Sequence, residues 1–267
     1  MEPLPPSLDA FPPREIAHKV EALGVTKAHT DAITLLLLSV LAGAFISLGA
    51  LLFTVVTTDP RLGLGVTRLL GGLAFCLGLI LVVVAGAELF TGNNLLALAW
   101  ASGRIGWREV LRNWVLVYLG NVAGCLGTVA LAAWAQVGAL GGGAVGETAR
   151  QIALAKTSLD AGPAFARGIL CNALVCLAVW LALGGRSLTD KILAILFPIT
   201  AFVAMGLEHS IANWFFLPFG RLVAGEAAGS WVGLARNLAW VSLGKLVGGT
   251  LLVAGVYWLA YLRTDPR

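Results

Sequence analysis

Two carboxylates and a histidine lie within long apolar runs, where a polar side chain needs a partner or a function. Residues 86–93 read GAELFTGN, and residues 206–213 read GLEHSIAN. Glycine, glutamate and asparagine recur at the same offsets, 120 positions apart. A carboxylate at membrane depth is costly, so Glu88 and Glu208 are expected to be paired and to mark a site. With His209 beside Glu208, the pattern predicts a duplicated transport protein whose site lies at the repeat.

The composition indicates a membrane protein. Of the 267 residues, 58% are hydrophobic and only 12% are charged, whereas a soluble domain carries about 25% charged residues. A bilayer crossing needs about 20 apolar residues. Six runs are long enough, and they predict an all-α membrane protein with six transmembrane helices in one channel domain, residues 31–262: 31–56, 68–102, 108–136, 163–184, 190–221 and 231–262.

The two ends of the chain are predicted to be cytoplasmic. Residues 1–30 form a leader without a signal-peptide core, and 14–28 have the pattern of an interfacial helix. That helix either covers the mouth of a pore or gates it. Ten Lys and Arg residues fall on the side of the termini, including the tail 263–267, and seven fall on the other side. This bias favours a cytoplasmic location for both termini.

The charge and the cysteines exclude several classes of function. The net charge of +4 is scattered between apolar runs, so no nucleic-acid partner is predicted. The four cysteines lie inside apolar segments without metal-ligand spacing, which predicts buried hydrophobic side chains and neither a metal nor another cofactor. They are Cys76, Cys125, Cys171 and Cys176.

A second correspondence supports the duplication. Arg112-Asn113 followed by Gly120-Asn121 matches Arg236-Asn237 followed by Gly244-Lys245, at an offset of 124. The two matches predict repeats of three spans each, at about 31–136 and 163–262. A unit with an odd number of spans must be inverted relative to its copy. Inverted repeats place a transport path at their interface, beside interrupted helices.

The second and fifth runs are predicted to be interrupted, because each is too long for one straight crossing at 1.5 Å per residue. Asn93 and Asn213 are predicted N-caps for half-helices over 94–100 and 214–219. The N–H groups at those helix starts would favour an anion. Glu88 and Glu208 are interpreted as the scaffold of the loops, accepting backbone N–H bonds.

These motifs resemble the formate/nitrite transporter family of pentameric anion channels. The resemblance rests on residues 87–93 (AELFTGN) and 208–213 (EHSIAN), and on 168–172 (GILCN) and 175–180 (VCLAVW). It implies an aquaporin-like protomer, a homopentamer in a bacterial-type inner membrane, and one substrate path through each protomer.

The resemblance also implies roles for individual residues. His209 would be the central polar residue of the path and would face Thr91. Lys156 and Asn172 would form a polar vestibule on the non-cytoplasmic side, and Glu208 and Asn213 would hold the loop. The apolar constrictions above and below would be formed by Phe75, Leu79, Leu89, Phe90 and Phe202.

Lys245 departs from the resemblance, because the family usually has asparagine at this point of the last helix. A lysine in an apolar span needs a carboxylate, carbonyls or water. An internal ion-pair strut with Glu88 or Glu208 is the favoured interpretation. The alternative is a positive charge that attracts anions along a path or at the central axis.

The predicted function is a channel for small monovalent weak-acid anions, formate first, with protons as a second partner. A neutral acid crosses an apolar slit more easily than its anion, and His209 could stabilise or protonate the anion there. Nitrite is the near alternative and hydrosulfide a distant one. A neutral-solute channel of aquaporin type should show paired Asn-Pro-Ala motifs, and the chain has none. An intramembrane enzyme is disfavoured because HExxH and GxSxG are absent.

Overall fold

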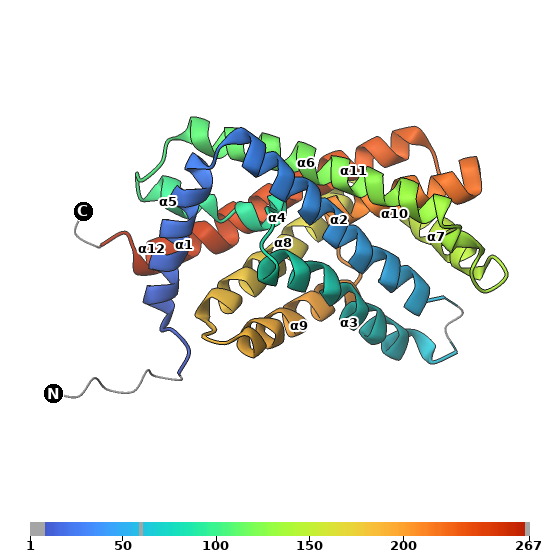
Figure 1. Ribbon diagram of the computed structural model, residues 1–267, viewed down its shortest axis with the longest axis horizontal. Helices are drawn as coiled ribbons and strands as arrows, with labels where there is room; N and C mark the ends of the chain where they lie inside the picture. Colours follow the sequence, from blue (N-terminus) through green and yellow to red (C-terminus); the bar gives the residue numbers. More distant parts are fainter. Residues whose placement is uncertain (1–8, 59–60, 265–267) are drawn as a thin grey trace.

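The computed structural model describes residues 9–58 and 61–264, and every regular element within them is helical (Figure 1). Residues 1–8 of the leader and 265–267 of the tail lie outside the described residues. In chain order the elements are α1 (Pro13–His29), α2 (Ala32–Val56), α3 (Gly63–Val84), α4 (Phe90–Asn93), α5 (Leu96–Ala101), α6 (Trp107–Trp134), η1 (Val137–Ala139), α7 (Ala144–Thr157), α8 (Ala161–Gly184), α9 (Leu188–Ala204), α10 (Ser210–Ala224), η2 (Gly225–Ala228), α11 (Trp231–Leu246), η3 (Val247–Gly255) and α12 (Val256–Tyr261).

Among the described residues, five continuous helices are long and apolar enough to cross a membrane: α2, α3, α6, α8 and the helix formed by α11, η3 and α12. The predicted fifth run, 190–221, is divided into α9 with 17 residues and α10 with 15. Each piece is shorter than the roughly 20 residues that a straight crossing needs. The predicted second run is likewise divided, into α3, α4 and α5.

Glycines allow two pairs of long helices to pack backbone against backbone. A Cβ on Gly124 of α6 would lie 2.0 Å from the Val40 carbonyl oxygen of α2. A Cβ on Gly248 would lie 2.2 Å from the Ile169 carbonyl oxygen of α8. Small residues at such crossings are how membrane helices gain close contact. The same kind of contact therefore joins α2 to α6 in the first half of the chain and α8 to η3 in the second half.

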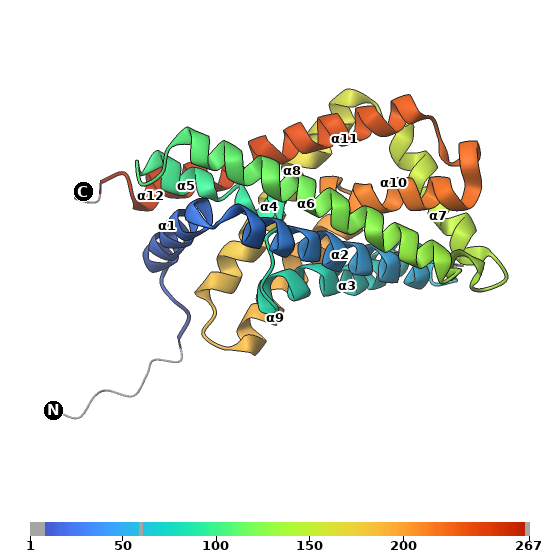
Figure 2. The same ribbon diagram turned by 45° about the horizontal axis from the view of Figure 1, so that its top comes forward.

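The short helices α1 and α7 lie at opposite ends of the bundle, and α12 lies at the α1 end (Figures 1 and 2). The sequence analysis predicted α1 but not α7. Charged residues in α7 prevent an apolar run, although Val145, Ala149 and Ala153 recur every four residues and are buried. In α1, Ile16 and Val20 are buried, whereas Leu23 is 40% exposed.

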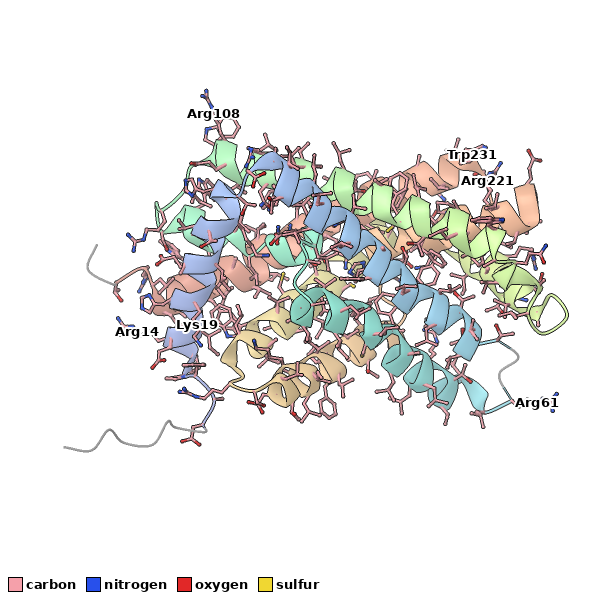
Figure 3. The ribbon with its side chains drawn as sticks, viewed as in Figure 1. Arg14, Lys19, Arg61, Arg108, Arg221 and Trp231 are labelled. Atoms are coloured by element: carbon pink, nitrogen blue, oxygen red, sulfur yellow. The ribbon has the colours of Figure 1, made fainter. Side chains whose placement is uncertain are left out.

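Charged and aromatic side chains mark the two ends of the bundle. Arg14, Lys19 and Arg108 lie at the α1 end, and Arg61 and Arg221 lie at the α7 end (Figure 3). Between these ends the outer helix surfaces expose many leucines and valines. Such a surface suits lipid or a second copy of the chain. The chain is therefore an integral membrane protein.

Candidate functional site

Both interrupted helices end in the same backbone motif. After α3, Gly86 takes a φ of +82°, and after α9, Gly206 takes a φ of +69°. In each case the next N–H bonds back to the helix, at 2.9 Å to the Val82 carbonyl and at 3.0 Å to the Phe202 carbonyl. This is the Schellman arrangement, which needs a left-handed residue just past the helix. The glycines that recur in the two motifs therefore terminate α3 and α9.

The chain becomes helical again earlier than predicted. Leu89 and His209 are extended and are the N-caps of α4 and α10. The prediction that Asn93 and Asn213 are N-caps is wrong, because both lie within the new helices. The His209 Nδ1 atom performs the capping in the second break by accepting a bond from the Ala212 N–H at 3.1 Å. The asparagine side chains are used elsewhere, on the glutamates.

A hydrogen-bonded network closes the first break. Lys27 Nζ donates to Glu88 Oε2 at 3.0 Å, and Asn93 Nδ2 donates to the same oxygen at 2.7 Å. Asn93 Nδ2 also donates to Asn113 Oδ1 at 2.9 Å. Asn113 Nδ2 in turn donates to the Lys27 carbonyl at 3.2 Å. The network joins α1, the break and α6.

A network of the same residue types closes the second break. Lys156 Nζ donates to both oxygens of Glu208, at 3.0 and 3.1 Å. Asn213 Nδ2 donates to Glu208 Oε2 at 2.7 Å and to Asn237 Oδ1 at 2.7 Å. Asn237 Nδ2 donates to the Lys156 carbonyl at 3.0 Å. These bonds correspond to those of the first network, with α7 and α11 in place of α1 and α6. One bond differs: Lys27 Nζ also donates to Asn93 Oδ1 at 2.9 Å, whereas Asn213 Oδ1 has no partner among the described residues.

These networks assign a scaffolding position to both glutamates. Their donors are lysine and asparagine side chains, whereas the sequence analysis expected backbone N–H groups. Lys27, Asn113 and Asn237 were missed as members of the site. One usable signal was the spacing, since Lys27 and Lys156 each stand five residues before a long helix, α2 and α8.

The ring of His209 packs against two phenylalanine rings that also contact each other. His209 is 4% exposed, and its ring stacks on Phe202 with centroids 5.8 Å apart. The Phe75 ring lies 6.1 Å from His209 and packs edge-on against Phe202 at 5.6 Å. Because Nδ1 accepts a bond, the neutral imidazole carries its hydrogen on Nε2. His209 can therefore offer one N–H donor from Nε2.

A cavity of about 460 Å³ reaches this aromatic group from the α7 end. Phe75, Phe202 and His209 line it together with Glu208 and Lys156. The guanidinium groups of Arg68 and Arg167 also line it. The cavity thus combines several cations with an apolar inner end.

A second cavity, of about 380 Å³, lies at the α1 end. Lys27 and Glu88 line it, as do Leu79 and Leu89. Leu79 follows Phe75 by one turn of α3, so this helix runs from one cavity to the other. The apolar side chains of Phe75 and Phe202 line the larger cavity, and those of Leu79 and Leu89 line the smaller one.

The remaining predicted residues have different positions. Asn172 does not line the cavity of Lys156; it is buried, and its Nδ2 donates to Asn94 Oδ1 at 2.7 Å and to the Thr91 carbonyl at 3.3 Å. The Thr91 hydroxyl is buried without a hydrogen-bond partner among the described residues. Phe90 lines neither cavity and packs edge-on against Tyr118 at 5.0 Å.

Lys245 does not form the predicted ion-pair strut. Glu88 and Glu208 are each paired with another lysine, and Lys245 Nζ instead donates to Cys171 Sγ at 2.7 Å. All four cysteines are free and buried. Within residues 9–58 and 61–264, no group of three His, Cys, Asp or Glu side chains could hold a metal ion.

Comparison with known proteins shows which sequences this chain resembles. A model described as formate/nitrite transporter matches residues 14–259. The formate channel FocA of Escherichia coli strain K12 is 38% identical to this chain, and the alignment covers 97% of each protein. A probable formate transporter of Methanothermobacter thermautotrophicus is 38% identical over 274 residues, covering 94% of this chain and 97% of that protein.

Solved structures agree with the sequence comparisons. A structure described as a pentameric formate channel with formate bound is 41% identical, with a TM-score of 0.80, over 87% of this chain and 98% of that one. An FNT family ion channel is 31% identical, with a TM-score of 0.84, over 92% of this chain and 98% of that one. The matches span nearly the whole chain in sequence and in structure. This protein therefore belongs to the formate/nitrite transporter family.

Proposed function

We propose that this protein is a channel for small monovalent weak-acid anions, with formate as its leading substrate, and that it works as a homopentamer. The similar proteins named above include a formate channel and a structure of a pentameric channel with formate bound. Each protomer would hold its own path, because both cavities lie within one chain. The site serves passage through a membrane, so we assign the protein no catalytic reaction.

The path runs between two inverted repeats in this proposal. The matching networks around Glu88 and Glu208 support a duplication that includes α1 and α7 as well as the longer helices. The opposite positions of α1 and α7 support the inversion (Figure 2). The excess of Lys and Arg on the side of the termini supports a cytoplasmic position for the α1 end in a bacterial-type inner membrane.

The observation that carries the proposal is the placement of His209. Its ring packs against both Phe75 and Phe202, which also contact each other, at the inner end of a cavity that Lys156 lines. An anion drawn to the cavity by its cations meets an apolar layer that disfavours charge. Nε2–H of His209 is the donor available at this layer. It would stabilise the anion or, through a proton, convert it to the neutral acid.

The positive end of α10 assists at the same place, because its first N–H groups face the break that contains His209. The first break offers less, since its half-helix is divided into α4 with four residues and α5 with six. Thr91 and Asn172 would present their unpartnered oxygens to the passing acid or to water. The two halves therefore contribute unequally to the path.

Nitrite is the second candidate, because the matching family model is described by both anions. The test is a flux assay in liposomes that compares formate, nitrite, hydrosulfide and chloride at two pH values. The proposal predicts formate uptake that rises as the external pH falls. Uptake of chloride at the rate of formate, with no pH dependence, would contradict the proposal. Faster uptake of nitrite than of formate would make nitrite the leading substrate.

A further inference from the structure

Lys245 is a buried cation without a carboxylate partner. It has 0% exposure, and a charge at that depth is costly unless something compensates it. Among the described residues, the two glutamates of the breaks are held by Lys27 and Lys156. The Cys171 sulfur is the one hydrogen-bond acceptor of the Lys245 side chain in that part of the chain.

The corresponding residue of the first half does different work. Asn121 Nδ2 donates to the Ser39 and Glu88 carbonyls, both at 2.8 Å, and Asn121 Oδ1 accepts from the Phe90 N–H at 2.9 Å. Asn121 thus ties the first break to α2 and α6. Lys245 makes none of these bonds in the second half, where His209 caps α10 itself. A structural role equivalent to that of Asn121 does not account for the lysine.

Lys245 lies between the two breaks. Its carbonyl accepts a bond at 2.8 Å from Asn172 Nδ2, which also bonds to the Thr91 carbonyl of the first break. Its Nζ lies 5.8 Å from the centroid of the Phe202 ring. His209, of the second break, stacks on that same ring. The ammonium group is therefore beside the segment that separates the two cavities.

Buried polar atoms without partners in the same region indicate a place for a polar ligand or water. The Thr91 and Ser210 hydroxyls and Asn172 Oδ1 have no hydrogen-bond partner among the described residues. All three residues have 0% exposure. Unpartnered buried polar groups are rare and call for a ligand or water. Thr91 and Ser210 belong to the two breaks, and Asn172 contacts the backbone of Lys245.

We infer that Lys245 is a specificity-determining residue that stabilises a small monocarboxylate as an anion between the Phe75–Phe202 layer and the Thr91 loop. This inference rests on the proposed function and deepens it. The lysine acts through its charge, because it lines neither cavity directly. A positive charge held there lowers the cost of the anionic form at the narrowest part, so part of the flux carries current.

Other charged and titratable groups act on the same region. Cys171 and Cys176 of α8 and Glu208 of the second break lie within electrostatic range of Lys245. His209 is in range of both Lys245 and Lys156. Glu208 is already held by Lys156 through both of its oxygens. Of the three lysines beside the breaks, Lys245 is the one whose charge is not paired with a glutamate among the described residues.

The test compares Lys245→Met with the wild-type protein in the same vesicles. Isotopic formate uptake measures total passage, and the current under an imposed membrane potential measures anionic passage. We expect the current per unit of uptake to fall at least tenfold in Lys245→Met, because a unit charge within about 10 Å of the anion changes its population by more than a factor of about ten at an effective dielectric constant of about 20. Lys191→Met, which removes a lysine from the start of α9, is the matched control and should leave the ratio unchanged.

Two further variants separate charge from structure. Cys171→Ala removes the sulfur and keeps the ammonium, so the current per unit of uptake should persist. Lys245→Asn, which copies Asn121, replaces Lys245→Met if the methionine variant does not assemble. An unchanged ratio in an assembled Lys245 variant overturns the inference while formate uptake by the wild type still supports the proposed function. A wild type that passes no small anion overturns both.

Discussion

Asn213 donates to Glu208 at 2.7 Å, directly beside the histidine that caps α10. Lys156 holds the same carboxylate from the other side at 3.0 Å. The residue that precedes His209 is thus fixed by two other helical segments, α7 and α10 itself. A site needs its functional group held in one position. These contacts hold the break so that the imidazole packs against two phenylalanine rings.

Removal of one charge of the Lys156–Glu208 pair should cost more stability than removal of both. Glu208→Gln leaves a largely buried ammonium unpaired, which should destabilise the protein by about 3 kcal/mol. The double variant Lys156→Met with Glu208→Gln leaves no unpaired charge and should recover part of that loss. Thermal unfolding of the detergent-solubilised protein measures both. A double variant less stable than Glu208→Gln would show that the pair does not act as a unit.

Lys156 should also draw anions into the larger cavity. Lys156→Ala leaves the Glu208 carboxylate uncompensated, so the apparent affinity for formate should fall more at low ionic strength than at high ionic strength. Arg221→Ala is the matched control, because Arg221 lies at the same end but stacks on Trp231 at 4.0 Å and does not line the cavity (Figure 3). Equal losses for Lys156→Ala at both ionic strengths would argue against attraction.

The left-handed glycine at the first break should not tolerate a side chain. Gly86→Ala meets no atom within 4 Å, so its cost is the backbone conformation at a φ of +82°. That conformation costs an L residue about 1 kcal/mol. Gly65→Ala, in α3 and equally open, should instead be neutral or stabilising. Equal melting temperatures for the two variants would contradict the strain at Gly86.

The exposed pair in α7 should give a pH-dependent contribution to stability. Hydrogen bonds from Arg150 lower the pKa of Glu147 from 4.5 to about 2. Since the pKa in the folded state is depressed, the stabilisation is complete above pH 4.5 and is lost as the pH falls toward 2. The difference in melting temperature between wild type and Glu147→Gln should be small, constant from pH 5 to 8, and vanish in acid. A difference that grows in acid would have the wrong sign.

The positions of the breaks could be predicted from the sequence, because Glu88 and Glu208 are conspicuous in apolar runs and glycine precedes each of them. The lysine partners of the two glutamates could not be predicted in this way. Lys27 and Lys156 lie outside the apolar runs, and only the folded chain brings them 3.0 Å from their glutamates. The helix α7 was missed because its charged residues conceal a buried face that amounts to one residue per turn.

Lys245 is the clearest case in which the sequence does not reveal the partner of a side chain. A lysine in an apolar span predicts a carboxylate partner by simple electrostatics, and two glutamates were available in the sequence. Each of them is occupied by another lysine in the fold. Asn172 shows the same limit, since its type suits a vestibule but its amide is used to hold Thr91 and Asn94. Residue types indicate which interactions a side chain can make, whereas the fold determines which of several candidate partners it contacts.

The central claim is that His209 mediates the passage of the acid between the two cavities. The most direct measurement is formate uptake into liposomes by His209→Phe across pH 5 to 8, with assembly checked by size-exclusion chromatography. His29→Phe, which changes an exposed histidine of α1, is the matched control. The account predicts that His209→Phe loses both the rate and the pH dependence of uptake while His29→Phe keeps them. Undiminished, pH-dependent uptake by an assembled His209→Phe protein would contradict it.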